Sequence, residues 1–187
     1  MMTRERYYAG WTFDEMVAVA QKNVELWKSV RARAHVDEEA VRRVRALGGE
    51  WHLLVLSEDW CGDSVNTLPF VDALAAHTNN VDLRIIGREA NPDLMDSHLT
   101  NVTSRSIPIV MVFDKQFLEH GWWGPRPTVL QHWVLGEGQA VDQDERYKEQ
   151  RRWYARDHGR TTVEDVVALL ESASRDLQGA SASISAA

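Results

Sequence analysis

The single cysteine of the chain, Cys61, is the residue whose type and position could do chemistry. It lies in a Trp-Cys-Gly-Asp-Ser segment at residues 60–64, where an apolar run leads into a predicted helix. A thiol at a helix N-terminus faces unpaired backbone N–H groups and the positive end of the helix dipole, and both favour the thiolate. We therefore expect Cys61 to be a nucleophile with a modestly lowered pKa, and Ser64 to donate its hydroxyl to the sulfur.

Acidic side chains surround this cysteine. A charged Asp63 would disfavour the thiolate, because like charges repel. Asp59 and Glu58 are the nearest other acids, and each could accept a proton or could simply be a solvated surface carboxylate. The alternative to a reactive Cys61 is an inert, buried thiol that packs as a small apolar side chain.

A single thiol restricts the chemistry that is open to the site. A cysteine three residues after Cys61 would complete a dithiol, and this chain has Ser64 there. Cys61 could attack a disulfide and hold a mixed disulfide until a small thiol releases it, or it could be oxidised to a sulfenic acid. The expected cycle needs an external low-molecular-weight thiol and no other cofactor.

The elements that must position Cys61 follow from hydrophobic spacing. The apolar run at 51–56 predicts a buried strand, and helical spacing follows Cys61. Further strands are predicted at 81–86, 109–113 and 117–120. This order predicts an α/β fold with a central mixed sheet and helices on its faces.

Helical segments are predicted on both sides of this core. One helix is expected from about Phe13 to about Arg33, and a shorter one follows Asp37. We expect one compact domain made of an N-terminal helical extension (1–49), a core (50–135), and a C-terminal helical extension with a fraying tail (136–187).

Taken together, these features resemble a thioredoxin. The family has Trp-Cys-Gly-x-Cys after a buried strand, a helix proline that Pro69 matches, and a cis-proline that Ile107-Pro108 matches. A bacterial branch of the superfamily also pairs Trp-Cys-Gly-Asp with Ser-Ile-Pro and Trp-Gly-Pro-Arg-Pro, found here at 59–63, 106–108 and 123–127. The resemblance covers roughly 50–124 and implies a three-layer thioredoxin-like fold. It departs from the family at Ser64, in place of the resolving cysteine, and at Val55, where many members carry a buried acid.

The resemblance also implies a substrate groove beside the sulfur. Its expected substrate-binding residues are Trp60, Gly62, Asp63, Ile107 and Pro108. Trp60 could alternatively be a core residue. The segment after the last strand could cover one end of the groove with Trp122, Trp123 and Arg126, where Arg126 could bind a carboxylate or form a structural ion pair.

Composition excludes several other classes of function. A net charge of −7 argues against nucleic acid or an anionic membrane as the partner. No run approaches the roughly 18 apolar residues of a membrane span, and the N-terminus has no signal-like apolar core. One cysteine gives no sign of an oxidising compartment, so we expect the cytoplasm. The seven histidines are scattered, which predicts no metal site, and the oligomeric state is left open.

Three functions remain. The first is a monothiol thiol–disulfide oxidoreductase that acts through Cys61 on a protein or small-molecule disulfide. The second is a non-catalytic binding or redox-sensing module that uses the groove around Trp60 and Pro108. The third, iron–sulfur cluster binding as in monothiol glutaredoxins, is disfavoured because Asp63 replaces the phenylalanine of their Cys-Gly-Phe-Ser motif.

Overall fold

A four-stranded mixed sheet forms the centre of the molecule. The computed structural model describes residues 2–185, and the side chains of residues 2–179. The strands, in the spatial order β2-β1-β3-β4, are β1 (Trp51–Ser57), β2 (Val81–Gly87), β3 (Ile109–Phe113) and β4 (Glu119–Trp123). β1 pairs parallel with β2 and antiparallel with β3, which in turn pairs antiparallel with β4. The predicted α/β class and central mixed sheet are confirmed.

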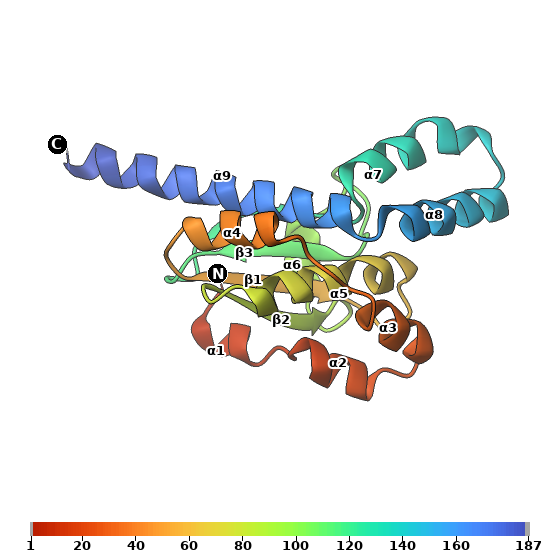
Figure 1. The fold of residues 1–187 in the computed structure, drawn as a ribbon, viewed down its shortest axis with the longest axis horizontal. Helices are drawn as coiled ribbons and strands as arrows, with labels where there is room; N and C mark the ends of the chain where they lie inside the picture. The colour runs from red at the N-terminus through yellow and green to blue at the C-terminus, as the bar shows by residue number, and fades with distance from the viewer. Residues whose placement is uncertain (1, 186–187) are drawn as a thin grey trace.

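Helices cover both faces of this sheet and make three layers (Figure 1). One face packs against α2 (Phe13–Val19), α3 (Val24–Arg31), α4 (Glu38–Ala46), α5 (Gly62–His77) and α9 (Arg160–Ser185). The other face packs against α1 (Arg4–Tyr8) and α6 (Pro92–Ser97). After the sheet come α7 (Thr128–Leu135), the 3₁₀ helix η1 (Glu137–Ala140) and α8 (Gln143–Asp157). Among the helices that the structure describes, none is long and apolar enough to cross a lipid bilayer.

The strand that leads to Cys61 is buried along its whole length, as is β3. All seven residues of β1 are buried, as its continuous apolar run predicts for a strand covered on both faces. Alternate side chains enter different cores: Leu53 and Val55 join the core beneath α5, whereas Leu54 and Leu56 join the core that also contains Cys61. Because β1 is anchored in both cores, it fixes the position of the loop and of Cys61 that follow it.

The long helix predicted for 13–33 is interrupted in the structure. It forms two helices, α2 and α3, and Asn23 between them is left-handed, with φ of 54°. The cause lies in another part of the chain, because the Asp59 carboxylate accepts hydrogen bonds from the backbone N–H groups of Gln21 and Lys22 at 2.7 and 2.9 Å. The carboxylate takes two N–H groups that a continuous helix would use itself.

Two predicted boundaries also differ. The last strand begins at Glu119 rather than Phe117, because Phe117 adopts a left-handed φ of 61° in a turn that the Asp114 carboxylate holds through the N–H groups of Gln116 and Leu118. The tail expected to fray from Gly179 is helical as far as Ser185, and residues 186–187 lie outside the described part.

The N-terminal segment covers the free edge of β2. Trp11 and Ile85 exchange two backbone hydrogen bonds of 2.8 Å, which form an antiparallel bridge outside the four strands. At the other side of the sheet, α9 packs against β4 and α5 and extends past the sheet (Figure 1). The helical ends of the chain are thus part of the sheet's packing.

Candidate functional site

Cys61 lies between the start of α5 and a cis-proline. It is the N-cap residue of α5, and its Sγ atom accepts a hydrogen bond of 3.4 Å from the backbone N–H of Ser64. The thiol donates to the carbonyl oxygen of Ile107 at 3.4 Å. The Ile107–Pro108 peptide bond is cis, which is the form that the resemblance implied. Cys61 is only 7% exposed, and it packs in the same core as Leu54 and Leu56.

Burial raises the pKa of the Cys61 thiol above its ordinary value. Ser64, through its side chain and its backbone N–H, acts in the opposite direction, and the nearby Asp63 charge adds to the increase. Our prediction of a modestly lowered pKa was therefore wrong, because desolvation outweighs the helix N-terminus. The expected O–H donation is present only in part: the Ser64 hydroxyl acts on the sulfur and lowers the pKa of Cys61, but Ser64 Oγ is buried and has no hydrogen-bond partner of ordinary geometry among the described residues.

The raised pKa gives a first testable expectation. Iodoacetamide reacts with the thiolate, so alkylation of native Cys61 should become about tenfold faster per pH unit from about pH 7 to 9, with no plateau in that range. The same chain unfolded in urea is the control, and its rate should level off near the ordinary thiol pKa of about 8.5. A plateau below about pH 8 in the native protein would contradict the effect of burial.

A buried ion pair lies immediately beside the cysteine. Asp63 Oδ2 is 2.7 Å from Arg126 Nη2, and Tyr154 donates its hydroxyl to Asp63 Oδ1 at 2.8 Å. The side chains of Asp63 and Arg126 are only 13% and 18% exposed. Burial raises the pKa of Asp63, while Arg126 and Tyr154 lower it. Arg126 was expected either to bind a ligand carboxylate or to form a structural ion pair, and the structure contains the ion pair. The Asp63 carboxylate is directed toward Arg126 and Tyr154.

Sequence reasoning assigned no site role to Tyr154. Its side chain is buried and comes from α8, far along the chain from Asp63. The available signal was composition, since Tyr154 is one of the few aromatic anchors in the highly charged segment 142–158. Burial also raises the pKa of its hydroxyl well above the ordinary value, so Tyr154 stays a neutral donor to Asp63.

The acids before the cysteine have structural partners. The Asp59 carboxylate accepts hydrogen bonds from two backbone N–H groups of the α2–α3 connection. The Asp59 backbone carbonyl oxygen accepts another from Trp27 Nε1 at 3.1 Å. Glu58 Oε1 accepts from the backbone N–H of Glu89 at 3.0 Å. Both acids fix the loop between β1 and α5, and the backbone N–H of Cys61 donates to the Glu58 carbonyl oxygen at 3.1 Å. Among the described residues, neither carboxylate is hydrogen-bonded to the Cys61 thiol.

Trp60 and Gly62 form the accessible border of the thiol. Trp60 is 49% exposed, and the Arg88 guanidinium lies 5.0 Å from the centroid of its indole ring. The alternative of a core tryptophan is therefore wrong. Gly62 opens α5, and a Cβ atom added there would contact nothing. Trp60 and Gly62 are exposed, whereas Cys61 between them is buried.

The two neighbouring tryptophans of β4 lie on opposite faces of the sheet. Trp123 is buried in the core beneath α5, and its Nε1 donates to Asp165 Oδ2 on α9 at 3.0 Å. Trp122 packs instead against the core that contains Cys61. Trp123 therefore connects β4 to α9 and does not cover the groove as we expected, because successive residues of a strand point to opposite faces.

The three short motifs meet in space. Cys61 contacts Ile107, Asp63 pairs with Arg126, and Gly124 lies against Pro108. The last contact is so close that a Cβ on Gly124 would stand 2.1 Å from the Pro108 carbonyl oxygen. Segments 59–63, 106–108 and 123–127 thus form one continuous structure around the thiol. Among the described residues, no group of three or more His, Cys, Asp or Glu side chains could hold a metal ion.

Comparisons with known proteins agree with this architecture. A family model described as thioredoxin matches residues 10–155, well beyond the segment 50–124 that carries the sequence resemblance. No curated protein matches the sequence. A solved protein of unknown function from Pseudomonas aeruginosa is 22% identical with a TM-score of 0.72, and the similarity covers 92% of this chain and 99% of that one. An HIV epitope scaffold is 20% identical with a TM-score of 0.72, over 91% and 98% of the two chains. At these identities both likenesses show the fold alone.

Proposed function

Since this chain belongs to the thioredoxin family, we propose that it is a monothiol thiol–disulfide oxidoreductase that acts through Cys61. The observation that carries the proposal is the position of Sγ, at the N-cap of α5 and 3.4 Å from the carbonyl oxygen that precedes cis-Pro108. There a disulfide could approach past Trp60 and Gly62, which border the sulfur.

The proposed exchange has two steps. The Cys61 thiolate attacks one sulfur of a disulfide R–S–S–R′, so that a Cys61–S–S–R bond forms and R′–S⁻ leaves. A second, external thiol R″–SH then loses its proton to solvent and attacks the R sulfur. This releases the Cys61 thiolate and the disulfide R–S–S–R″. One disulfide is consumed and one is formed, so the external thiol supplies the reducing equivalents.

The surrounding residues support particular roles in these steps. The Ser64 backbone N–H, 3.4 Å from Sγ, stabilises the thiolate as it forms. The Asp59 and Glu58 carboxylates are occupied by backbone N–H groups, so we assign proton removal to solvent or to the attacking molecule. The raised pKa of the thiol makes the exchange faster as the pH rises above neutrality.

The burial of the sulfur favours small substrates. At 7% exposure, Cys61 offers little surface to a folded protein, whereas a low-molecular-weight disulfide needs less room to reach the sulfur. We therefore propose mixed disulfides of a small thiol as the substrate class and the same small thiol as the resolving partner.

The direct test uses a glutathione mixed disulfide with glutathione as the external thiol. We expect the parent chain to turn it over at about pH 8 and Cys61→Ser to fall to the uncatalysed background, because no other sulfhydryl is present. Ser97→Ala is the matched control, since Ser97 Oγ bonds to the carbonyls of its own short helix and to the adjacent His98. Equal turnover by the parent and Cys61→Ser would refute the proposal.

A non-catalytic binding module is the second candidate. The observation that favours it is the buried thiol with its raised pKa, beside a half-exposed Trp60 that could contact a partner. In the same assay, Ser64→Cys separates the two functions. An active Ser64→Cys chain with an inactive parent would mean that the scaffold supports exchange and that the natural chain binds without turnover.

A further inference from the structure

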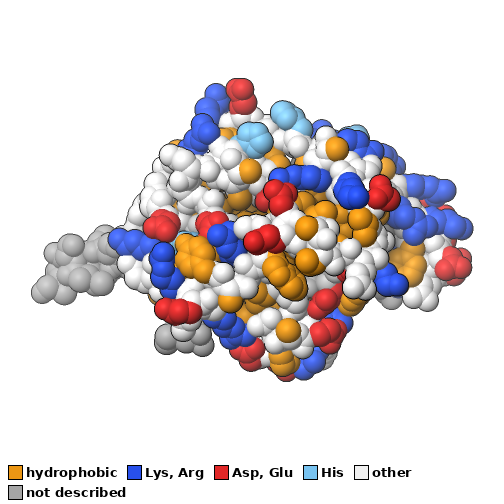
Figure 2. All heavy atoms as spheres, turned by 90° about the horizontal axis from the view of Figure 1, so that it is seen from below, with side chains coloured by type: hydrophobic (Ala, Val, Ile, Leu, Met, Phe, Trp, Pro, Cys, Tyr) orange, Lys and Arg blue, Asp and Glu red, His pale blue; other side chains and the backbone are white. Residues whose placement is uncertain are grey.

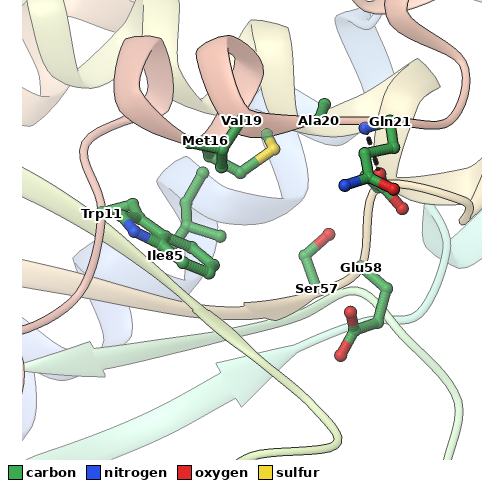
Figure 3. A pocket seen from close by; sticks show the side chains of 9 residues that line it. Trp11, Met16, Val19, Ala20, Gln21, Ser57, Glu58 and Ile85 are labelled. Carbon is green, nitrogen blue, oxygen red and sulfur yellow. Dashed lines mark hydrogen bonds between the residues drawn. The ribbon is translucent and has the colours of Figure 1, made fainter.

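A cavity of about 230 Å³ lies on the other side of the loop that carries Cys61. It is open to the surface and is lined by α2, by the last residue of β1 with the loop that follows it, and by Ile85 of β2 (Figure 3). Trp11, Met16, Val19 and Ile85 are the large apolar residues that line it. Met16 and Ile85 belong to the core beneath α5, whereas Cys61 belongs to the core on the other face of the sheet. The cavity is therefore separate from the thiol site.

The floor of the cavity carries a polar group without a partner. Ser57, the last residue of β1, is 3% exposed, and its Oγ finds no hydrogen-bond partner in the part of the chain that the structure describes. Figure 3 shows this hydroxyl directed toward the space below α2. Leaving a buried hydroxyl unpaired is costly, so a molecule that supplies a donor or acceptor there would bind more favourably.

The side chains that line the cavity favour a flat, apolar ligand such as an aromatic ring. The indole of Trp11 is half-exposed and the thioether of Met16 is buried, and both make favourable contacts with aromatic rings. Figure 2 views the molecule from the side of α1 and α2 and shows hydrophobic side chains reaching this surface among charged ones. Tyr8, Trp11 and Val19 are among the exposed large hydrophobic residues of this region.

The rim of the cavity selects against negative charge. Glu58 and Asp59 both line it, and no Lys, Arg or His is among its lining residues. The Asp59 carboxylate is held beside the cavity because it accepts the backbone N–H of Gln21, which also lines it. The Glu58 carboxylate accepts the backbone N–H of Glu89 and is directed away from the space below α2 (Figure 3). An anionic ligand would be repelled here, whereas an uncharged or cationic one would not.

We propose that this cavity binds a small uncharged or cationic aromatic molecule that carries one hydroxyl or amino group. Its ring lies between Trp11 and Met16, and its polar group hydrogen-bonds to Ser57 Oγ. The site requires no chemistry at Cys61, so it stands or fails independently of the proposed exchange reaction.

The test is an amide NMR titration of the full chain with three probes: phenol, toluene and benzoate. We expect phenol to bind saturably with a Kd of about 1 mM and to shift the resonances of Met16, Ser57 and Ile85. Toluene, which lacks the hydroxyl, and benzoate, which is anionic, should each bind about tenfold more weakly than phenol.

Two variants make the test decisive. Ser57→Ala should weaken phenol about tenfold while leaving toluene unchanged, because only phenol uses the hydroxyl. Val19→Trp, at an exposed position on the wall, should fill the opening and abolish the binding of phenol and toluene. The proposal is overturned if phenol shifts none of these resonances, if Ser57→Ala binds phenol as tightly as the parent, or if benzoate binds as tightly as phenol.

Discussion

Arg126→Met is expected to lower the free energy of unfolding by about 3–5 kcal/mol, because it leaves a buried carboxylate without its cation. Arg126 Nη2 is 2.7 Å from Asp63 Oδ2, and both side chains are less than one fifth exposed. Methionine fills a similar volume and removes only the charge and the hydrogen bonds. Urea unfolding, followed by tryptophan fluorescence, measures the difference.

The pH dependence of this variant has a definite sign. Burial already raises the pKa of Asp63, with Arg126 acting against that rise, so the folded state binds this proton more tightly than the unfolded chain does. The stability that comes from this tighter proton binding at Asp63 is fully present below the ordinary Asp pKa of about 3.9. It is lost as the pH rises through the folded-state pKa of Asp63. Loss of Arg126 raises the pKa of Asp63 further. The difference in free energy of unfolding between the parent and Arg126→Met should therefore grow from about pH 4 to about pH 7.

Two controls accompany Arg126→Met. Lys148→Met removes the exposed pair with Glu145 and should change stability by less than about 0.5 kcal/mol. The double variant Asp63→Asn with Arg126→Met should recover part of the loss, because the unpaired charge is gone. A loss below about 1 kcal/mol for Arg126→Met would mean that the Asp63 charge is compensated by other groups.

Gly124→Ala is expected to destabilise the chain by about 3 kcal/mol or more. The added Cβ would stand 2.1 Å from the Pro108 carbonyl oxygen and 3.3 Å from the Ile109 Cα, and both are backbone atoms that cannot turn aside. Gly124 also has a φ of 140°, a conformation that other residues rarely adopt. Urea unfolding should show a lower midpoint, and the same change should displace Pro108 from beside the thiol.

Gly62→Ala provides the matched control for this substitution. Its Cβ would meet no atom within 4 Å, and the residue lies at the first position of α5. We expect its stability to match or slightly exceed that of the parent, because alanine favours helix. Equal stability of Gly124→Ala and Gly62→Ala would show that segment 123–127 can move away from Pro108 at little cost.

The strands that position Cys61 could be predicted because their signal is local. The run at 51–56 is apolar without alternation, as a strand covered on both faces must be, and the segment at 109–113 behaves in the same way. The position of Cys61 at a helix N-terminus followed from the helical spacing of apolar residues after it. Each of these inferences depends on residues that are neighbours in the sequence.

The electrostatics of the site could not be predicted in the same way. The pKa of Cys61 depends on how much of the sulfur is desolvated, which is set by distant residues such as Leu54 and Ile107 in the same core. The environment of Asp63 depends on Tyr154, and the break between α2 and α3 depends on Asp59. Spacing along the chain carries no information about such contacts.

The mutual contact of the three motifs has a consequence for how this sequence can diverge. Asp63 needs Arg126, Pro108 needs a residue without a side chain at position 124, and Cys61 donates to the carbonyl next to Pro108. A change in any one of these segments alters the surroundings of the other two. A substitution in one of these segments is therefore expected to require compensating substitutions in the other two.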